Sequence, residues 1–143
     1  MSVLDASIAL KWVLPEAELT EQADRFFQDL LQTRQVIEAP PHFPGEVCNA
    51  IWQRQRRGLL SGDLAEEAVN TFLAFGIPTR SPRSLHRQAF TLARIYNLPS
   101  LYDSLYVALA QLLHTTFWTA DQRLINALDG RLDFVHWLGN YPG

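Results

Sequence analysis

The chain has 143 residues, the length of one compact domain, and its 48% hydrophobic and 19% charged residues are typical of a folded protein. The net charge of −3 excludes a strongly basic protein, and there is no polybasic tail of the kind that binds nucleic acid. The single cysteine, Cys48, excludes a disulfide framework and a thiolate metal site. No apolar run is long enough for a signal peptide or a membrane span, so we expect a soluble, cytoplasmic protein.

Short strands and amphipathic helices alternate along the chain without a linker or a repeat, which predicts one domain over residues 1–143. The first half is expected to contain strand 2–4, helix 7–14, helix 19–32, strand 36–39, helix 44–57 and a helix from 61 to about 75. The second half is expected to contain edge strand 76–79, helix 84–96, helix 100–114, strand 115–119, helix 122–128 and strand 133–137. This order favours an α/β fold with a short central parallel sheet flanked by helices on both faces.

Acidic residues follow two of the predicted strands, at the edge of the sheet where ligands bind in parallel α/β folds. Asp5 comes directly after strand 2–4, and Asp121 comes after strand 115–119. Asp103 begins a helix about 15 Å long at ~1.5 Å per residue, and the next strand returns roughly 16 Å at ~3.3 Å per residue. We therefore expect Asp121 to lie level with Asp103.

A fourth acid, Glu46, lies near the start of a predicted helix, and convergence of the four carboxylates would make an all-oxygen pocket. Hard divalent cations such as Mg²⁺ and Mn²⁺ prefer oxygen ligands. Simpler explanations stand beside this one. Asp5 and Asp121 could cap the helices that follow them, and Glu46 could share a solvated helix face with Asn49.

Asp103 has a capping explanation as well, because it stands three residues after Ser100, the spacing of a capping box. Helix 100–114 is otherwise apolar almost all round. Ser104 and Gln111 share its polar stripe, and Asp103 is turned about 100° from that stripe. An acid on the buried side of a helix needs polar partners, which favours a place for Asp103 in a pocket.

Two groups of arginines are candidates for contacts with a phosphate backbone: Arg54, Arg56 and Arg57, and Arg80, Arg83 and Arg87. The first group lies at a helix C-terminus, where positive charge complements the helix dipole, and we favour a structural role for both groups. The four histidines, His42 among them, show no metal-ligand spacing. No Gly-rich loop indicates a nucleotide cofactor.

Four segments resemble, in order, the four motifs of the PIN-domain nucleases, and most closely those of the VapC-type toxins of bacterial toxin–antitoxin pairs. The segments are Val3-Leu4-Asp5-Ala6-Ser7, Glu46-Val47-Cys48-Asn49-Ala50-Ile51, Tyr102-Asp103-Ser104-Leu105-Tyr106-Val107-Ala108-Leu109-Ala110 and Trp118-Thr119-Ala120-Asp121-Gln122-Arg123-Leu124. The likeness spans essentially the whole chain. It departs from the family at Ser104, where alanine is commoner, and no acid is missing.

The resemblance implies a metal-dependent endoribonuclease that forms a homodimer and is inhibited by a small antitoxin protein. Its Mg²⁺ or Mn²⁺ would be bound, directly or through water, by Asp5, Asp103 and Asp121. Glu46 would orient or deprotonate the attacking water, or complete the metal shell. Ser7 and Thr119 would support the metal ligands through hydrogen bonds.

The resemblance leaves two alternatives open: a PIN-domain ribonuclease of RNA processing that has no antitoxin, and a catalytically inert PIN-like module that binds RNA or protein. The complete set of acids argues against an inert module. An antitoxin would lie in an apolar groove near Trp12, Phe26 and Phe27, although ordinary core packing is the favoured role of the two phenylalanines.

Overall fold

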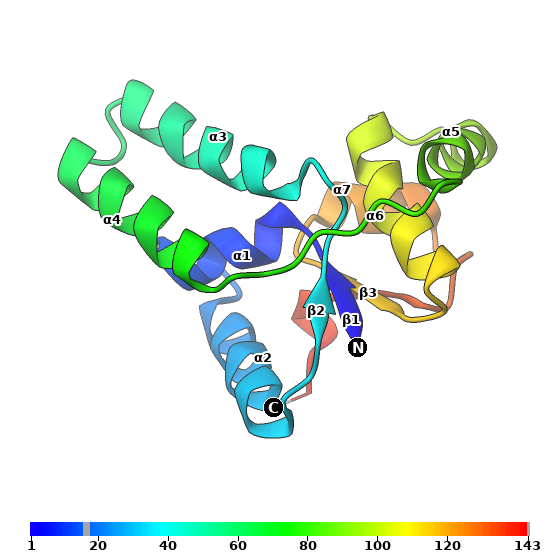
Figure 1. The fold of residues 1–143 in the computed structure, drawn as a ribbon, viewed down its shortest axis with the longest axis horizontal. Coiled ribbons are helices and arrows are strands. Elements are labelled where there is room, and N and C mark those ends of the chain that lie inside the picture. The colour runs from blue at the N-terminus through cyan, green and yellow to red at the C-terminus, as the bar shows by residue number, and fades with distance from the viewer. Residues whose placement is uncertain (16–17, 143) are drawn as a thin grey trace.

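The computed structural model describes residues 1–15 and 18–142, which form a four-stranded parallel sheet with helices around it (Figure 1). In sheet order the strands are β2 (Ile37–Glu38), β1 (Ser2–Leu4), β3 (Thr116–Thr119) and β4 (Val135–Trp137). The helices of the described residues are α1 (Ala6–Val13), α2 (Thr20–Thr33), α3 (Phe43–Arg56), α4 (Gly62–Ala74), α5 (Leu85–Tyr96), α6 (Leu101–Leu112), α7 (Gln122–Leu128) and a 3₁₀ turn, η1 (Leu138–Asn140). The predicted α/β class is confirmed.

Side chains of β3 point alternately to the two faces of the sheet, as strand geometry requires. Phe117 is fully buried and stacks on Tyr106 of α6, with ring centroids 5.8 Å apart. Trp118 points to the other face and contacts Phe26 of α2, with ring centroids 5.6 Å apart. Helix α6 therefore covers one face, with α5 packed outside it, and α1 and α2 lie on the other face (Figure 1).

Local sequence signals account for several helix ends. Ser61 and Ser100 cap α4 and α6, because each hydroxyl accepts a backbone N–H from the first turn. Pro44 lies in the first turn of α3, where its missing N–H costs no hydrogen bond. Gly58 follows α3 with a φ of 75°, which a side chain would strain.

The predicted edge strand over residues 76–79 is reduced to an isolated bridge between Ala39 and Thr79. Pro78 has no N–H to donate to a longer ladder. Its carbonyl instead accepts the N–H of Ala39 at 3.1 Å. The segment therefore runs beside the end of β2 without extending the sheet.

The polar stripe predicted on α6 is covered by α5, fully at Ser104 and partly at Gln111. Ser104 is fully buried, and its hydroxyl donates to the carbonyl of Ala89 in α5. Gln111 of α6 accepts a hydrogen bond from Gln88 of α5. The stripe is polar because α5 packs against these two side chains and supplies their hydrogen-bond partners, and not because it faces solvent.

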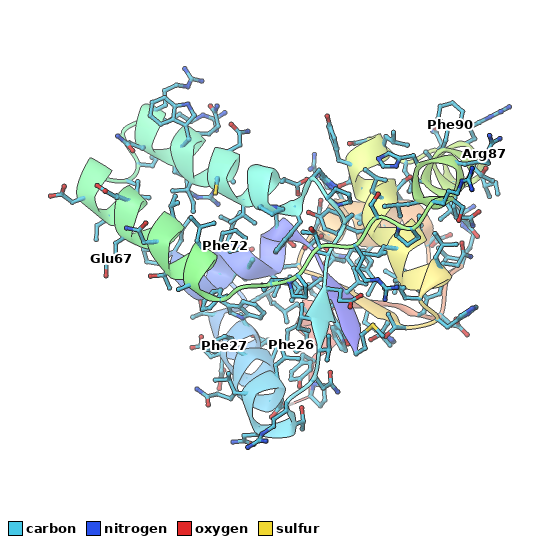
Figure 2. The ribbon with its side chains drawn as sticks, viewed as in Figure 1. Phe26, Phe27, Glu67, Phe72, Arg87 and Phe90 are labelled. Carbon is cyan, nitrogen blue, oxygen red and sulfur yellow. The ribbon has the colours of Figure 1, made fainter. Side chains whose placement is uncertain are left out.

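The pair of helices α3 and α4 extends away from the sheet (Figure 1). Phe72 of α4, labelled in Figure 2, packs edge-on against Phe43 of α3 with ring centroids 5.4 Å apart. Within the described residues, each helix is too short or too polar to cross a membrane. The carboxyl ends of β1 and β3 lead into α1 and α7, and the predicted acids lie there.

Candidate active site

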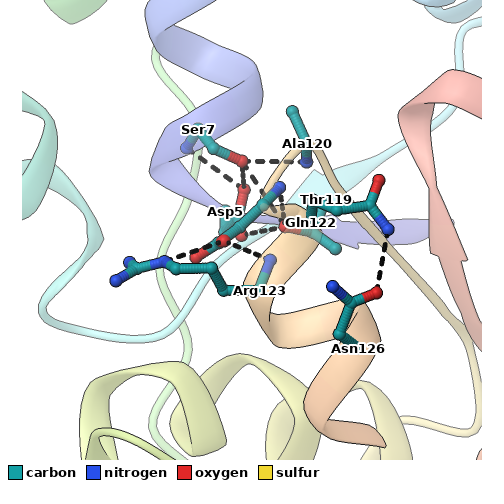
Figure 3. A network of polar contacts seen from close by, with 8 residues as sticks. Asp5, Ser7, Thr119, Ala120, Gln122, Arg123 and Asn126 are labelled. Atoms are coloured by element: carbon teal, nitrogen blue, oxygen red, sulfur yellow. Dashed lines mark hydrogen bonds and ion pairs between the residues drawn. The ribbon is translucent and has the colours of Figure 1, made fainter. Parts of the chain in front are cut away.

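Asp5 lies at the carboxyl end of β1 and caps α1. Its Oδ1 accepts the N–H of Ser7 at 3.1 Å and also the hydroxyl of Ser7. Its Oδ2 accepts the hydroxyl of Thr119 at 2.5 Å (Figure 3). The predicted cap is therefore present, but this buried carboxyl group also makes a long-range contact that capping does not require.

Ser7 and Thr119 connect Asp5 to the chain that follows β3 (Figure 3). Each hydroxyl has one hydrogen, which it donates to Asp5, and its oxygen accepts a backbone N–H in return. The Ser7 oxygen accepts from Ala120 at 2.9 Å, and the Thr119 oxygen accepts from Asp121 at 3.0 Å. This network fixes the ends of two neighbouring strands to each other.

Asp121 caps α7, since its Oδ1 accepts the N–H of Arg123 at 3.0 Å. The Arg123 guanidinium also approaches this oxygen, with Nε 3.6 Å away, while the arginine side chain is largely in solvent (Figure 3). The capping explanation holds for Asp121 too. This capping role is compatible with a role in the site, because the Asp121 carboxylate also raises the pKa values of Asp5 and Asp103.

Asp103 lies in the first turn of α6 and is half-buried. The Ser100 hydroxyl accepts the N–H of Tyr102 at 3.0 Å, whereas a capping box would use the N–H of Asp103. The capping explanation of Asp103 is therefore weaker than its sequence spacing suggests.

The four acids act on one another electrostatically. Burial raises the pKa of Asp5 to about 7; hydrogen bonds from Ser7 and Thr119 oppose the rise, and the Glu46 and Asp121 carboxylates add to it. Burial also raises the pKa of Asp103 to about 6, with further contributions from Asp121 and Glu46. Glu46 and Asp121 therefore lie within electrostatic reach of both raised groups.

Opposing charges moderate the pKa of Asp103, because Arg123 and His42 lower it. Among residues 1–15 and 18–142, no three His, Cys, Asp or Glu side chains form a ready-made metal shell. The acids thus share one electrostatic neighbourhood without forming a closed cage.

His42 shows no ligand spacing in the sequence, yet it lies against Glu46. Its Nε2 is 3.4 Å from Oε2 of Glu46, and the two side chains are 16% and 37% exposed. Glu46 therefore does not belong to a simply solvated face. The i, i+4 separation of the two residues on one helix was the available signal for this pair.

Comparison with known proteins identifies the family. No model of a known protein family matches the chain. Ribonuclease VapC3 from Pyrobaculum aerophilum is 32% identical over 124 residues, which cover 85% of this chain and 90% of that protein. The chain belongs to the VapC family. The predicted resemblance to VapC-type PIN-domain proteins is thereby confirmed.

A solved structure shares the fold of this chain. The crystal structure of PAE2754 from Pyrobaculum aerophilum aligns with a TM-score of 0.70, covering 96% of this chain and 89% of the other. The two are 15% identical, so this comparison bears on the fold alone. Within this fold, the network of Asp5, Ser7 and Thr119 lies where the first and fourth motifs meet.

Proposed function

We propose that the chain is a metal-dependent endoribonuclease, the toxin of a type II toxin–antitoxin system. The observation that carries this proposal is that the Glu46 and Asp121 carboxylates, which come from separate segments, raise the pKa values of both Asp5 and Asp103 at one edge of the sheet. Membership of the family that includes Ribonuclease VapC3 supports RNA as the substrate. Perturbed acids that come from distant segments are typical of catalytic sites.

The donor set fits a hard divalent cation. Mg²⁺ keeps several waters and commonly uses one or two protein carboxylates together with substrate phosphates, so a closed protein cage is not required. The raised pKa values of Asp5 and Asp103 support a cation as well, because neighbouring carboxylates repel one another when unneutralised. We assign the binding of Mg²⁺ or Mn²⁺ to Asp5, Asp103 and Asp121.

Each side chain has a role in this proposal. When bound, the ion would supply charge neutralisation at the phosphate and favour ionisation of water. Glu46 orients the attacking water or takes its proton. Ser7 and Thr119 hold both oxygens of Asp5 in place through the hydroxyl hydrogen bonds described above.

The antitoxin is proposed to lie in an apolar groove of about 470 Å³ beside α1 and α2. Its lining includes Trp12, Phe27, Leu31 and Val36, with Phe75 beyond them. The Trp12 ring is 5.1 Å from the ring of Phe27 and 6.0 Å from the ring of Phe75. An amphipathic peptide segment would bury its apolar side chains here.

Phe26 and Phe27, both labelled in Figure 2, differ in burial and in whether they line this groove. Phe26 is buried and packs against Trp118 and Tyr141, so its predicted role as ordinary core is confirmed. Phe27 is half-buried and lines the groove. Only Phe27 of the pair is thus available to a partner.

A homodimer is proposed on the resemblance, and α5 offers one surface for it. Phe90 is 58% exposed and Ile95 is 61% exposed, and both line a shallow pocket on this helix (Figure 2 labels Phe90). Grouped apolar side chains on a surface are typical of protein–protein contacts. Light scattering on the purified chain tests this: a mass of one chain at all concentrations contradicts the dimer.

Cleavage of RNA by the purified, partner-free protein tests the proposed function. We expect single-stranded or structured RNA to be cut with Mg²⁺ or Mn²⁺ and cutting to stop in EDTA. Undiminished cutting in EDTA contradicts the metal mechanism, and no cutting of any RNA favours an inert module. Activity without any small partner in pull-downs from the native host favours an RNA-processing nuclease.

A further inference from the structure

Two side chains next to Glu46, those of His42 and Tyr106, carry buried polar atoms without a hydrogen-bond partner. The atoms are Nδ1 and Nε2 of His42 and the hydroxyl oxygen of Tyr106. Unsatisfied buried polar atoms are uncommon in folded proteins, because each costs free energy and needs an explanation. Their common neighbour indicates that the explanation lies at Glu46.

The imidazole of His42 is held by two tyrosine rings. Its centroid lies 5.1 Å from the ring of Tyr102 and 4.8 Å from that of Tyr106, which it meets edge-on. The Nε2 atom is 3.4 Å from Oε2 of Glu46, at ion-pair distance but without the geometry of a hydrogen bond. Packing thus aims the ring at the carboxylate.

Tyr106 approaches the same carboxylate from α6. Its ring is 1% exposed and stacks on Phe117 with an angle of 7° between the planes, so the core fixes its orientation. Burial raises the pKa of its hydroxyl, and the Glu46 and Asp5 carboxylates raise it further. The hydroxyl is close enough to the Glu46 side chain and to the backbone of Ala6 for polar contacts with both to shift its pKa, although neither contact has the full geometry of a hydrogen bond.

We propose that His42 and Tyr106 are positioning residues, whose Nε2–H and hydroxyl hold the Glu46 carboxylate in the orientation that its role on water requires. This inference rests on the proposed function. Hydrogen bonds in catalytic sites are often long or poorly aligned before substrate binds and tighten in the complex. The contacts to Glu46 have that character, and both donors are placed by rigid packing.

The variant Tyr106→Phe isolates the hydroxyl. The removed atom has no hydrogen-bond partner, so the fold should keep its stability or gain some. We expect kcat for Mn²⁺-dependent RNA cleavage to fall about 10- to 100-fold, because small misplacement of a catalytic group has effects of that size. KM should change little, since Tyr106 is 1% exposed and offers almost no surface to a substrate.

Two variants of His42 separate the donor from the ring. His42→Phe keeps the packing between Tyr102 and Tyr106 but loses the N–H, whereas His42→Gln loses the ring and keeps a donor of similar reach. A positioning role predicts more activity in the glutamine variant than in the phenylalanine variant. The reverse order shows that ring packing alone matters and overturns the proposal.

Matched controls remove the same groups elsewhere. Tyr141→Phe deletes a hydroxyl that donates to Asp29, and His136→Phe deletes an imidazole packed on Trp118. Neither change should alter kcat. If Tyr106→Phe and His42→Phe cut RNA as fast as the parent and these controls, the proposal is wrong while the proposed function stands.

Unfolding in urea gives a readout that does not depend on activity. Glu46→Gln is combined with Tyr106→Phe and with His42→Phe, and the midpoint shifts of single and double variants are compared. Side chains in contact give non-additive shifts, whereas independent ones add. If the parent itself cuts no RNA, the proposed function fails, and additive midpoint shifts then overturn this inference as well. Non-additive shifts support it.

Discussion

Thr119 Oγ1 donates a 2.5 Å hydrogen bond to Oδ2 of Asp5, across 114 positions of sequence. The two residues meet because Leu4 and Trp118, which precede them, are partners in the parallel register of β1 and β3. The same Thr119 oxygen accepts the N–H of Asp121 at 3.0 Å. One hydroxyl therefore orients the carboxyl group of Asp5 and fixes the backbone of Asp121.

Thr119→Val tests this double role, because valine keeps the shape and removes the hydroxyl. The N–H of Asp121 and Oδ2 of Asp5 would each lose a partner in a buried setting. We expect the free energy of unfolding at neutral pH to fall by about 1–3 kcal/mol, measured by urea unfolding. Thr119→Ser, which keeps the hydroxyl, should lie close to the parent. A valine variant as stable as the parent contradicts this account of the network.

Stability in EDTA should depend on pH through the two acids with raised pKa values. Their ordinary value is 3.8, and burial raises the pKa of Asp5 to about 7 and that of Asp103 to about 6. The folded state thus holds protons that the unfolded chain has released. The resulting stabilisation is complete below the unfolded value and is lost as the pH rises through about 6 and 7.

Urea unfolding in EDTA between about pH 4.5 and about pH 8 measures this loss. The free energy of unfolding should decline across that range, most steeply between the ordinary and the raised pKa values. Because other groups also titrate in this range, the same series on Asp103→Asn serves as the control and should show a smaller decline. A flat profile in the parent would show that the carboxyl groups are not perturbed.

Binding of Mg²⁺ or Mn²⁺ should compete with these protons. The proposed ligands must be ionised to bind, so affinity should fall as the pH is lowered through the raised pKa values of Asp5 and Asp103. The rise in melting temperature on adding Mn²⁺ measures the effect, since binding to the folded state adds stability by mass action. An equal rise at about pH 5.5 and about pH 8 would contradict this competition.

The sequence was sufficient to place Asp5 and Asp121 at the same edge of the sheet, because parallel strands bring their carboxyl ends together, whereas Thr119 was added only through the family resemblance. It also predicted the helices and the four paired strands, because apolar periodicity and helix caps depend on residues only a few positions apart. The sequence did not predict that α5 covers the polar stripe of Ser104 and Gln111, because a pattern on one helix does not tell which neighbour packs against it.

The sequence did not predict that His42 and Tyr106 lie beside Glu46. Tyr106 stands among apolar residues of α6, in a pattern typical of core residues, and its ring is indeed buried in the core. Its hydroxyl matters only because α3 brings Glu46 beside it, a relation set by packing between helices. His42 had a usable signal in its separation from Glu46, but spacing alone does not show that both tyrosine rings hold the imidazole.

The groove proposed for the antitoxin can be tested at Leu31, which lines it and is 59% exposed. Leu31→Lys should fold normally, because the side chain is already largely in water. It should weaken binding of a co-expressed small partner by about tenfold or more, since burying a leucine contributes about 1.5–3 kcal/mol. Titration calorimetry with the purified partner measures the change.

Leu73→Lys is the matched control, because Leu73 is 57% exposed on α4 and is not part of the groove lining. It should bind the partner as the parent does. Equal weakening by both variants would indicate a general charge effect. Unchanged binding by Leu31→Lys would place the partner on another surface.

Asp103→Asn separates a role in the acidic site from simple stabilisation of the helix dipole. The change removes one charge from a group of carboxylates that repel one another, while keeping nearly the same shape. In EDTA, the variant should therefore be as stable as the parent or more stable. RNA cleavage should fall by orders of magnitude, and Mg²⁺ should raise the melting temperature less than it does in the parent.

Asp63→Asn provides the comparison, since Asp63 lies in the first turn of α4 as Asp103 lies in the first turn of α6, but is exposed. Loss of its charge should cost about 0.3–1 kcal/mol through the helix dipole and leave cleavage unchanged. If Asp103→Asn behaves like Asp63→Asn, destabilised and fully active, Asp103 is not part of the site. Opposite signs of the two stability changes, with activity lost only at Asp103, support the assignment of this carboxylate to metal-dependent cleavage.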